Sequence, residues 1–327
     1  MDQVFSKFSK LKVLVIGDAM IDNYLWGKVE RISPEAPIPI VTVTKEENRL
    51  GGAANVSMNI QALGATPILI SVIGNDEKGR IFEDLMEEKK LPREGIFIDP
   101  SRITTVKTRI ISGGKQIVRA DQEISTLINH IFEVEIFDKI RTIMESQEIN
   151  IVIFVDYDKG LITPWLIDQV KALAKSKNIL IAADPKSRNF NNYQQVDLFK
   201  PNFKEFKDGL KLSGEKTDME QLKIVSEKFK KENQIGLLFI TLSELGVFLT
   251  NGVKQNYYPA EVRDIADVSG AGDTVIATAS LCLAAGLPVP LMAQLSNLAG
   301  GLVCEKLGVV PIDLEQLKKE GKKIHII

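Results

Sequence analysis

Histidine is almost absent from this sequence, with only His130 and His325 among 327 residues. This scarcity argues against mechanisms that pair serine or cysteine with histidine, and against a zinc site built on histidine. Cysteine is as rare, and Cys282 and Cys304 each lie in an apolar, small-residue stretch typical of a helix. We expect two buried, reduced thiols, because nothing at metal-ligand spacing surrounds them. Any chemistry must therefore come from carboxylates, lysines and glycine-rich loops.

The sequence also lacks an apolar run long enough to cross a bilayer. Its first residues, MDQVFSKFSKLK, have neither the apolar core nor the cleavage site of a signal peptide, so we expect a cytoplasmic protein. The net charge of -2 at pH 7 gives no general attraction for nucleic acid or anionic membrane, and neither is expected as a partner. With 44% hydrophobic and 26% charged residues, the composition is that of a globular protein with a substantial core.

Short β-rich runs alternate with helical patterns along most of the chain. This alternation predicts an α/β fold with a doubly wound, mostly parallel sheet between two layers of helices, formed by residues 1–327 as a single domain. Strands are expected at 12–16, 67–73, 150–155, 179–183 and 237–241. Helices are expected at 53–63, 76–90, 131–145, 164–176 and 219–231.

Two stretches interrupt the alternation. Residues 23–44 contain two β-like runs with no helix between them. Residues 104–121 contain two more around Gly113-Gly114, a dipeptide that suits a tight hairpin turn. We assign both stretches to a small antiparallel β flap over the carboxyl edge of the sheet, where α/β folds bind ligands.

The segment from Ser269 to Asp273, Ser-Gly-Ala-Gly-Asp, stands directly ahead of the apolar helical pattern 274–285. Small residues let the backbone approach a ligand closely, and the first free N–H groups of a helix point at an anion. An Asp at the same place would take the proton from an attacking hydroxyl while those amides stabilise a transferring phosphoryl group. The alternative is a glycine turn in which Asp273 caps the helix, since Asp is a favoured cap. The segment alone does not separate the two.

A second glycine cluster and two carboxylates indicate a sugar site. Gly51 and Gly52 open a helical pattern and would admit a sugar against the backbone, while Asn55 offers an amide to a hydroxyl. Asp18 and Asp22 follow the first strand, where such folds place ligand contacts. For these residues the alternative is a glycine turn before a helix and carboxylates that cap turns.

Polar residues after later strands indicate a phosphate and metal site. Lys186 follows the strand 179–183 and would project toward phosphate. Asn202 and Glu205 place two oxygen ligands on one helix face, and magnesium in phosphoryl transfer uses few protein oxygens, often through water. An Asn that caps a helix with Glu at its third position would look the same. The turn 241–246 between two strands is a candidate part of a nucleotide pocket.

Together and in this order, the motifs resemble the ribokinase-like (pfkB) carbohydrate kinases. The segment 51–55 is similar to the N-terminal signature of that family, and 267–273 with the following helix is similar to the C-terminal signature. The likeness runs through nearly the whole chain, and within the family it is closest to the kinase domain of bacterial ADP-heptose synthases. That closer likeness rests on the segments 17–22, 31–41, 156–160, 297–301 and 306–308, of which 31–41 is the most specific.

The resemblance implies an ATP- and Mg²⁺-dependent kinase that phosphorylates the anomeric O1 of D-glycero-D-manno-heptose 7-phosphate. The 1,7-bisphosphate product would serve ADP-heptose and lipopolysaccharide core synthesis, and the enzyme would form a homodimer through the flap. The resemblance implies Asp273 as the catalytic base, with Gly270, Ala271 and Gly272 as the anion hole. It implies sugar contacts from Asp18, Asp22, Gly51, Gly52 and Asn55. It places Lys186, Asn202, Glu205, Ser243, Gly246, Gly272 and Asn297 around ATP and the metal, with Asn202 and Glu205 holding the metal through water.

Basic residues of the flap are candidates for gripping the distal phosphate of such a substrate. Lys107 and Arg109 lie on one face of the first run by strand alternation. A two-residue turn at Gly113-Gly114 would pair Arg119 with Thr108 and put Arg119 on the opposite face, unless a bulge shifts the register. We predict phosphate contacts from Lys107 and Arg109, and a substrate or dimer contact from Arg119. Alternatively, all three are solvated charges that discourage strand aggregation.

The sequence departs from the synthases in two respects. The bifunctional synthases continue into a nucleotidyltransferase domain with a histidine-rich motif, for which these 327 residues leave no room, and the flap tip 112–115 is richer in glycine than expected. Two alternatives stay open: a kinase of this fold for another sugar or sugar phosphate, and a non-catalytic sugar-sensing relative. A dinucleotide-binding oxidoreductase is disfavoured, because the first strand runs into Gly-Asp-Ala-Met-Ile-Asp and not into a glycine-rich phosphate loop.

Overall fold

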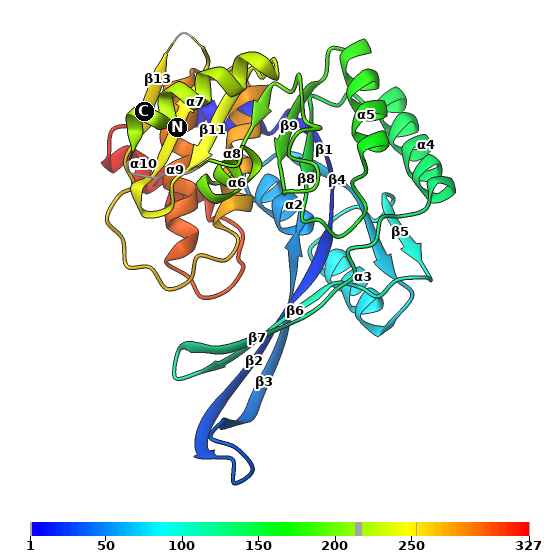
Figure 1. Cartoon of the computed structure of the whole chain (residues 1–327), viewed down its shortest axis with the longest axis vertical. Helices are drawn as coiled ribbons and strands as arrows, with labels where there is room; N and C mark the ends of the chain where they lie inside the picture. The colour runs from blue at the N-terminus through cyan, green and yellow to red at the C-terminus, as the bar shows by residue number, and fades with distance from the viewer. Residues whose placement is uncertain (1, 213–217, 253, 327) are drawn as a thin grey trace.

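A computed structural model describes residues 2–212, 218–252 and 254–326 of the chain (Figure 1). Its main sheet is parallel except at one edge, where the last two strands run antiparallel to their neighbours. Helices join most of the consecutive parallel strands on both sides of the first strand, as expected for a doubly wound sheet. The spatial order of the strands is β13 (Gln255–Tyr258), β12 (Val247–Thr250), β11 (Leu237–Thr241), β10 (Leu198–Phe199), β9 (Leu180–Asp184), β8 (Ile151–Val155), β1 (Lys12–Gly17), β4 (Thr66–Gly74) and β5 (Ile96–Asp99).

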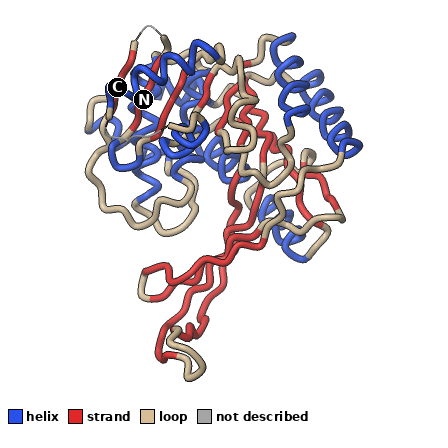
Figure 2. The backbone as a smooth tube through the Cα atoms, viewed as in Figure 1, coloured by secondary structure: helices blue, strands red, loops and turns tan. Residues whose placement is uncertain are grey.

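Helices cover both faces of this sheet (Figure 2). A separate apolar core is buried on each face. Strand β1 shows why: Val13 and Val15 point into one core, and Leu14 and Ile16 into the other. The first core is closed by α1 (Asp2–Phe8), α2 (Ala53–Ala62), α3 (Glu77–Glu88), α8 (Ala271–Ala284), α9 (Val289–Cys304) and α10 (Leu314–Lys323). The second core is closed by α4 (His130–Ser146), α5 (Pro164–Ser176), α6 (Phe203–Gly209) and α7 (Met219–Glu232).

The predicted three-layer α/β fold is confirmed by this arrangement, and both cysteines are buried free thiols, as expected. None of the described helices is long and apolar enough to span a bilayer.

The flap is a second sheet that projects from the body of the molecule (Figure 1). Its order is β3 (Pro39–Gly52), β2 (Ala19–Ile32), β6 (Val106–Ser112) and β7 (Lys115–Gln122). The two outer pairs are antiparallel hairpins, but the central pair, β2 with β6, is parallel. The reason is that each central strand follows a parallel strand of the main sheet, so both leave its carboxyl edge in the same direction.

The register of the β6–β7 hairpin corrects one expectation. A bulge lies between Ile110 and Ile111, so that Arg109 pairs with Arg119 and not Thr108 with Arg119. Directly opposed residues of two paired strands point to the same face. Arg119 therefore shares a face with Arg109, contrary to the opposite face predicted from an unbulged turn.

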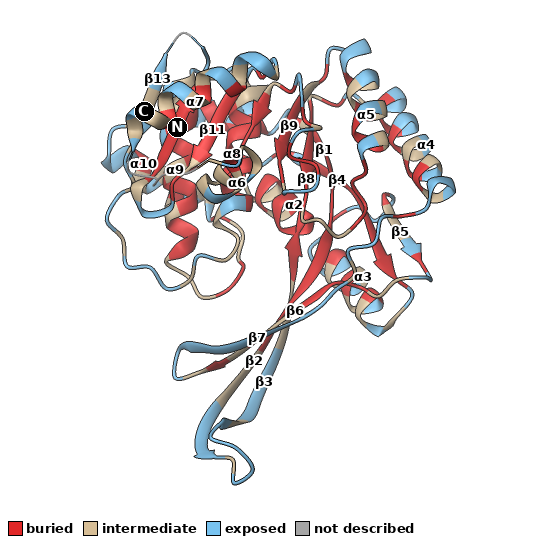
Figure 3. Cartoon of the chain, in the orientation of Figure 1, coloured by how far each residue is buried: buried red, intermediate tan, exposed pale blue. Residues whose placement is uncertain are grey.

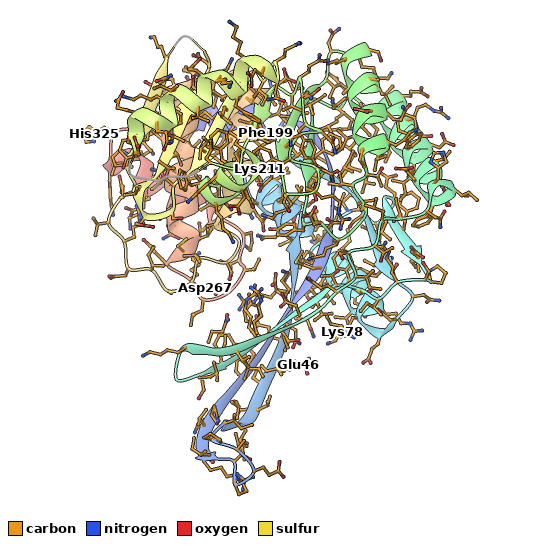
Figure 4. The ribbon with its side chains drawn as sticks, in the orientation of Figure 1. Glu46, Lys78, Phe199, Lys211, Asp267 and His325 are labelled. Carbon is orange, nitrogen blue, oxygen red and sulfur yellow. The ribbon has the colours of Figure 1, made fainter. Side chains whose placement is uncertain are left out.

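Side chains at the base of the flap bind it to the body, while its outer half is exposed (Figure 3). The Tyr24 hydroxyl accepts a hydrogen bond from the Val309 N–H at 2.7 Å. The Arg49 guanidinium donates to the Val309 carbonyl at 3.1 Å. Lys78 on α3 reaches Glu46 on β3, with Nζ and Oε1 3.5 Å apart (Figure 4). The base of the flap is thus held over the carboxyl edge of the sheet.

Candidate active site

Helix α8 begins earlier than the sequence predicted, at Ala271 and not at 274. Gly270 is its N-cap residue, with φ 80° and ψ -3°, a left-handed conformation that favours glycine. A Cβ at Gly270 would lie 2.8 Å from the Asn55 amide nitrogen, so the position also needs glycine for space. Asp273 therefore stands in the first turn of the helix and is not its cap. The amides of Gly272 and Asp273 belong to that first turn, whose N–H groups have no earlier turn to bond.

The Asp273 carboxylate is bonded by two side chains from distant parts of the chain. Asn55 on α2 donates to Oδ2 at 2.8 Å, and the Tyr157 hydroxyl donates to Oδ1 at 2.7 Å. Asp273 is only 3% exposed, and its burial raises its pKa to about 6, with both hydrogen bonds opposing the rise. Such a carboxylate is ionised at neutral pH yet basic enough to accept a proton from a hydroxyl.

Lys186 and Lys200 lie near this carboxylate, and Lys200 was not predicted from the sequence. Lys200 is 2% exposed, and its Nζ is 3.0 Å from Asp184 Oδ2. The charges of Lys200 and Asp184 act on Asp273 in opposite directions, the lysine lowering the pKa of Asp273 and the aspartate raising it. A buried lysine beside a helix N-terminus is well placed to balance phosphate charge. In the sequence Lys200 stands directly after a buried strand and just ahead of Pro201-Asn202.

Asp22 and the predicted glycine contacts meet at the start of the flap. The Asp22 carboxylate accepts a hydrogen bond from Arg109 and occupies the space that a Cβ on Gly51 would fill. Burial raises the pKa of Asp22, and the Arg109 guanidinium opposes that rise. Gly51 thus admits a carboxylate against the backbone, and Gly52, beside it, precedes α2 and so positions Asn55.

Asp18 is engaged with the loop that follows β8. Its carboxylate accepts hydrogen bonds from the backbone N–H groups of Tyr157 at 2.9 Å, Lys159 at 3.1 Å and Leu161 at 3.3 Å. Burial raises the pKa of Asp18, although the three backbone bonds oppose it. Asp18 therefore fixes the loop that carries Tyr157, a role that its sequence position did not reveal. A direct contact between Asp18 and a sugar stays a prediction.

Lys186, Asn202 and Glu205 form one cluster beside Tyr157. Asn202 caps α6 through the Glu205 N–H, and Glu205 accepts from the Asn202 N–H, both at 2.8 Å, which makes a capping box. Glu205 also forms an ion pair with Lys186, whose Nζ lies 5.4 Å from the centre of the Tyr157 ring. Burial would lower the pKa of Lys186, but Asp184 and Glu205 outweigh it and raise that pKa.

These contacts limit how a metal would fit this cluster. Both Glu205 oxygens are already bonded, so a direct metal bond would have to break one of those contacts. Among the described residues no group of three or more histidine, cysteine, aspartate or glutamate side chains is arranged to hold a metal. A Mg²⁺ ion held through water by few protein oxygens requires neither a direct bond to Glu205 nor such a group.

The remaining predicted nucleotide contacts lie at the antiparallel edge of the sheet. Ser243 starts the short helix η1 (Ser243–Leu245) between β11 and β12, and the Gly246 carbonyl accepts from the Leu242 N–H at 2.7 Å to close the turn. Strand β11 reaches the cluster above, since Thr241 forms a bridge with Asn202. Asn297 on α9 donates to the carbonyl of Pro259 at 2.8 Å. The structure thus places Ser243 two residues after Thr241, which pairs with Asn202, and Asn297 beside the segment that follows β13.

The three flap cations predicted to contact the substrate are paired with carboxylates. Arg109 binds Asp22, and Lys107 Nζ lies 3.7 Å from Asp121 Oδ2. Arg119 donates to Asp121 Oδ1 at 2.8 Å and is more exposed than the other two cations. With the bulged register, all three cations lie on one face of the hairpin.

A carboxylate beside a helix N-terminus and two lysines, at the carboxyl edge of a parallel sheet, is an arrangement that suits phosphoryl transfer. The chain belongs to the pfkB family of carbohydrate kinases, because the sequence model of that family matches residues 10–316. Membership confirms the predicted enzyme class, a phosphotransferase that acts on a sugar hydroxyl.

Relatives with high similarity carry the name bifunctional protein HldE. The protein from Geotalea uraniireducens (strain Rf4) is 38% identical over 326 residues, which are 99% of this chain and 66% of that protein. The protein from Helicobacter pylori (strain HPAG1) is 38% identical over 309 residues, 94% of this chain and 65% of that protein. The chain thus spans about two thirds of the length of these curated relatives.

Solved structures show the same fold at low sequence identity. Phosphofructokinase-2 from Escherichia coli in complex with fructose-6-phosphate has a TM-score of 0.79 and 16% identity, covering 96% of this chain and 99% of that one. Ribokinase from Arabidopsis thaliana complexed with ribose and ATP has a TM-score of 0.72 and 16% identity, covering 94% and 99%. The ribokinase-like fold predicted from the sequence is thereby confirmed.

Proposed function

We propose that this chain transfers the γ-phosphoryl group of ATP to the anomeric O1 of D-glycero-D-manno-heptose 7-phosphate. The products are heptose 1,7-bisphosphate, for ADP-heptose and lipopolysaccharide core synthesis, and ADP. The observation that carries the kinase reaction is the Asp273 carboxylate, held by two hydrogen bonds at the N-terminus of α8. The choice of sugar is supported by the HldE names of the relatives and by the heptose-kinase-like segments of the sequence.

In this reaction Asp273 accepts the proton of the O1 hydroxyl as O1 bonds to the γ-phosphorus. The bond between that phosphorus and the β,γ-bridging oxygen breaks, and ADP leaves. The first-turn amides of α8 and the nearby Lys186 and Lys200 offset the negative charge on the transferring group. A bound Mg²⁺ would neutralise phosphate charge, and Asn202 and Glu205 are the residues that would hold it through water.

ADP release from a panel of sugars and sugar phosphates tests the proposal. The 7-phosphorylated heptose is expected to give the highest kcat/KM, since its distal phosphate meets the flap cations. A higher kcat/KM for a different sugar phosphate would reassign the substrate within the same fold. No sugar-dependent ADP release with any sugar would favour a non-catalytic sugar-sensing protein.

Replacing Glu205 by glutamine is expected to raise the magnesium concentration that gives half-maximal rate. The carboxylate supplies the strong negative charge of the pair with Asn202, and the amide keeps its shape without the charge. A magnesium titration at fixed ATP measures the change. An unchanged titration curve with a lower melting temperature would mean that Glu205 acts only in the capping box and in the ion pair with Lys186.

We also propose that the chain forms a homodimer through the flap. The outer flap exposes several apolar side chains, and exposed sheet faces of this kind favour association. They are Val29, Ile32, Ile38, Val43, Ile117 and Val118.

Light scattering during size-exclusion chromatography is expected to give twice the chain mass for the wild type and a monomer for Ile32→Glu. A matched control is Ile131→Glu on α4, because Ile131 is 84% exposed and lies outside the flap. Monomeric wild type, or equal effects of both substitutions, would contradict dimerisation through the flap.

A further inference from the structure

Tyr157 directs three different groups at three functional side chains. Its backbone N–H donates to Asp18 at 2.9 Å, and its hydroxyl donates to Asp273 at 2.7 Å. The face of its ring lies 5.4 Å from the ammonium of Lys186, within the range of a cation–π contact. Among the described residues, only Tyr157 makes these contacts with Asp273, Asp18 and Lys186 at the same time.

The loop that carries Tyr157 is held firmly, so the position of its hydroxyl is determined. Asp18 binds the backbone of this loop at three N–H groups. Asp156, just ahead of Tyr157, accepts from the Asp158 N–H at 2.9 Å and from the Tyr193 hydroxyl at 2.9 Å. A side chain on a loop with so many buried hydrogen bonds has little freedom to leave its partner.

We infer that Tyr157 is a positioning residue for the base: its hydroxyl fixes one oxygen of Asp273 while Asn55 fixes the other. This inference rests on the proposed role of Asp273 as the base. With both oxygens held, the carboxylate is confined to one orientation before the sugar arrives, which is the arrangement that proton transfer requires. Asp18 acts through Tyr157 and keeps the loop in place.

The charges around Asp273 explain why a neutral donor is needed. From β9, Asp184 favours the protonated form of Asp273, and Lys200 beside it favours the ionised form. Lys186 adds a second positive charge, and Asn55 from α2 donates without a charge. Burial, with the Asp273 charge, raises the pKa of Tyr157 well above its usual value, so the hydroxyl stays a donor across the working pH range.

The test compares Tyr157→Phe with the wild type across pH. In the plot of kcat/KM against pH, activity falls on the acid side as Asp273 becomes protonated. Losing a hydrogen bond to the ionised carboxylate raises the pKa of Asp273 and should move this acid limb to higher pH by about one unit. The expected loss is about fivefold near pH 6 and approaches 10-fold at lower pH, but stays below about threefold near pH 8.5, where Asp273 is ionised in both proteins. Substrate phosphates titrate identically in both proteins, so the difference between them belongs to the enzyme.

Tyr193→Phe is the matched control. The Tyr193 hydroxyl donates to Asp156, a second buried carboxylate whose burial also raises its pKa to about 6. The control therefore removes the same kind of bond from a carboxylate that the proposed reaction does not use. Because Asp18 still holds the loop at three N–H groups, Tyr193→Phe should leave the acid limb where it is in the wild type. An equal shift in both variants would overturn the inference, because the effect would then be a general loss of packing.

A second variant separates the hydroxyl from the ring. Tyr157→Leu should shift the acid limb as Tyr157→Phe does and, in addition, raise the KM for ATP, because the ring beneath Lys186 is gone. A carboxyl resonance of Asp273, assigned by its absence in Asp273→Asn, gives a readout without turnover and should titrate about one unit higher in Tyr157→Phe. If Tyr157→Phe is active and neither the acid limb of kcat/KM nor the titration of the Asp273 resonance changes, the inference is overturned but the proposed kinase function is not. A shifted titration in a protein that phosphorylates no sugar would support the contact and overturn the kinase proposal.

Discussion

Asp273→Asn is expected to lower turnover by about 10²–10⁴-fold, the range for losing a positioned general base. Asparagine keeps the shape of the side chain, still accepts from Asn55, and can donate to the Tyr157 hydroxyl, so the fold should be retained. ATP binding should stay nearly intact, because the α8 amides, Lys186 and Lys200 are unchanged. Turnover under saturating substrates and ATP binding by calorimetry measure the two effects separately.

The pH dependence supplies a second check on the same residue. The pKa of Asp273 is raised to about 6, and the base works only when ionised, so wild-type activity should fall as pH drops through that value. The residual activity of Asp273→Asn should lack this limb. Near-normal turnover in Asp273→Asn would mean that the carboxylate only organises Asn55 and Tyr157.

Arg109→Ala is expected to weaken kcat/KM for the 7-phosphorylated heptose by about 1.5–3 kcal/mol, the cost of a lost hydrogen bond to a charged group. One N–H group of Arg109 donates to Asp22, and its guanidinium has further N–H donors available for a phosphate. Comparing the same sugar with and without the 7-phosphate separates the two contacts. A loss of kcat/KM that is equal for both sugars reports the contact between Arg109 and Asp22. Any additional loss for the phosphorylated sugar reports the contact between Arg109 and the 7-phosphate.

Lys115→Ala is the control for this measurement, since Lys115 is an exposed cation at the tip of the same hairpin. Lys115→Ala should leave kcat/KM unchanged for both sugars. Arg119→Ala should show a smaller excess in the same direction as Arg109→Ala, because the bulge puts Arg119 on the same face. Equal losses of Arg109→Ala on both sugars would assign Arg109 to Asp22 alone and remove the flap from phosphate recognition.

The periodic parts of the fold could be predicted because their patterns are local. Strand 237–241 and helix 164–176 match β11 and α5 residue for residue, and most other predicted elements differ by one or two residues. The start of α8 was missed, since Ala271-Gly272 carries no helical periodicity and glycine is a poor helix former. The bulge that aligns Arg119 was not predictable either, as Gly113-Gly114 also suits an unbulged turn.

The candidate site was predictable only in part, for a physical reason. Asp273 and Asn55 belong to recognisable glycine-rich segments, and the structure joins them with a hydrogen bond. Tyr157 was missed as a partner of Asp273 because it lies 116 residues away, and only the crossing of the chain between β8 and α8 brings them together. Lys200 was missed because a lysine after a strand is usually exposed, and its burial depends on Asp184 from β9.

Phosphorus NMR of the product formed from ATP and D-glycero-D-manno-heptose 7-phosphate tests the central claim most directly. A new phosphorus signal coupled to the anomeric proton, rising in step with ADP and nearly absent with Asp273→Asn, is the predicted result. A phosphate on another hydroxyl, or ADP formed with inorganic phosphate and no new sugar phosphate, would contradict the account.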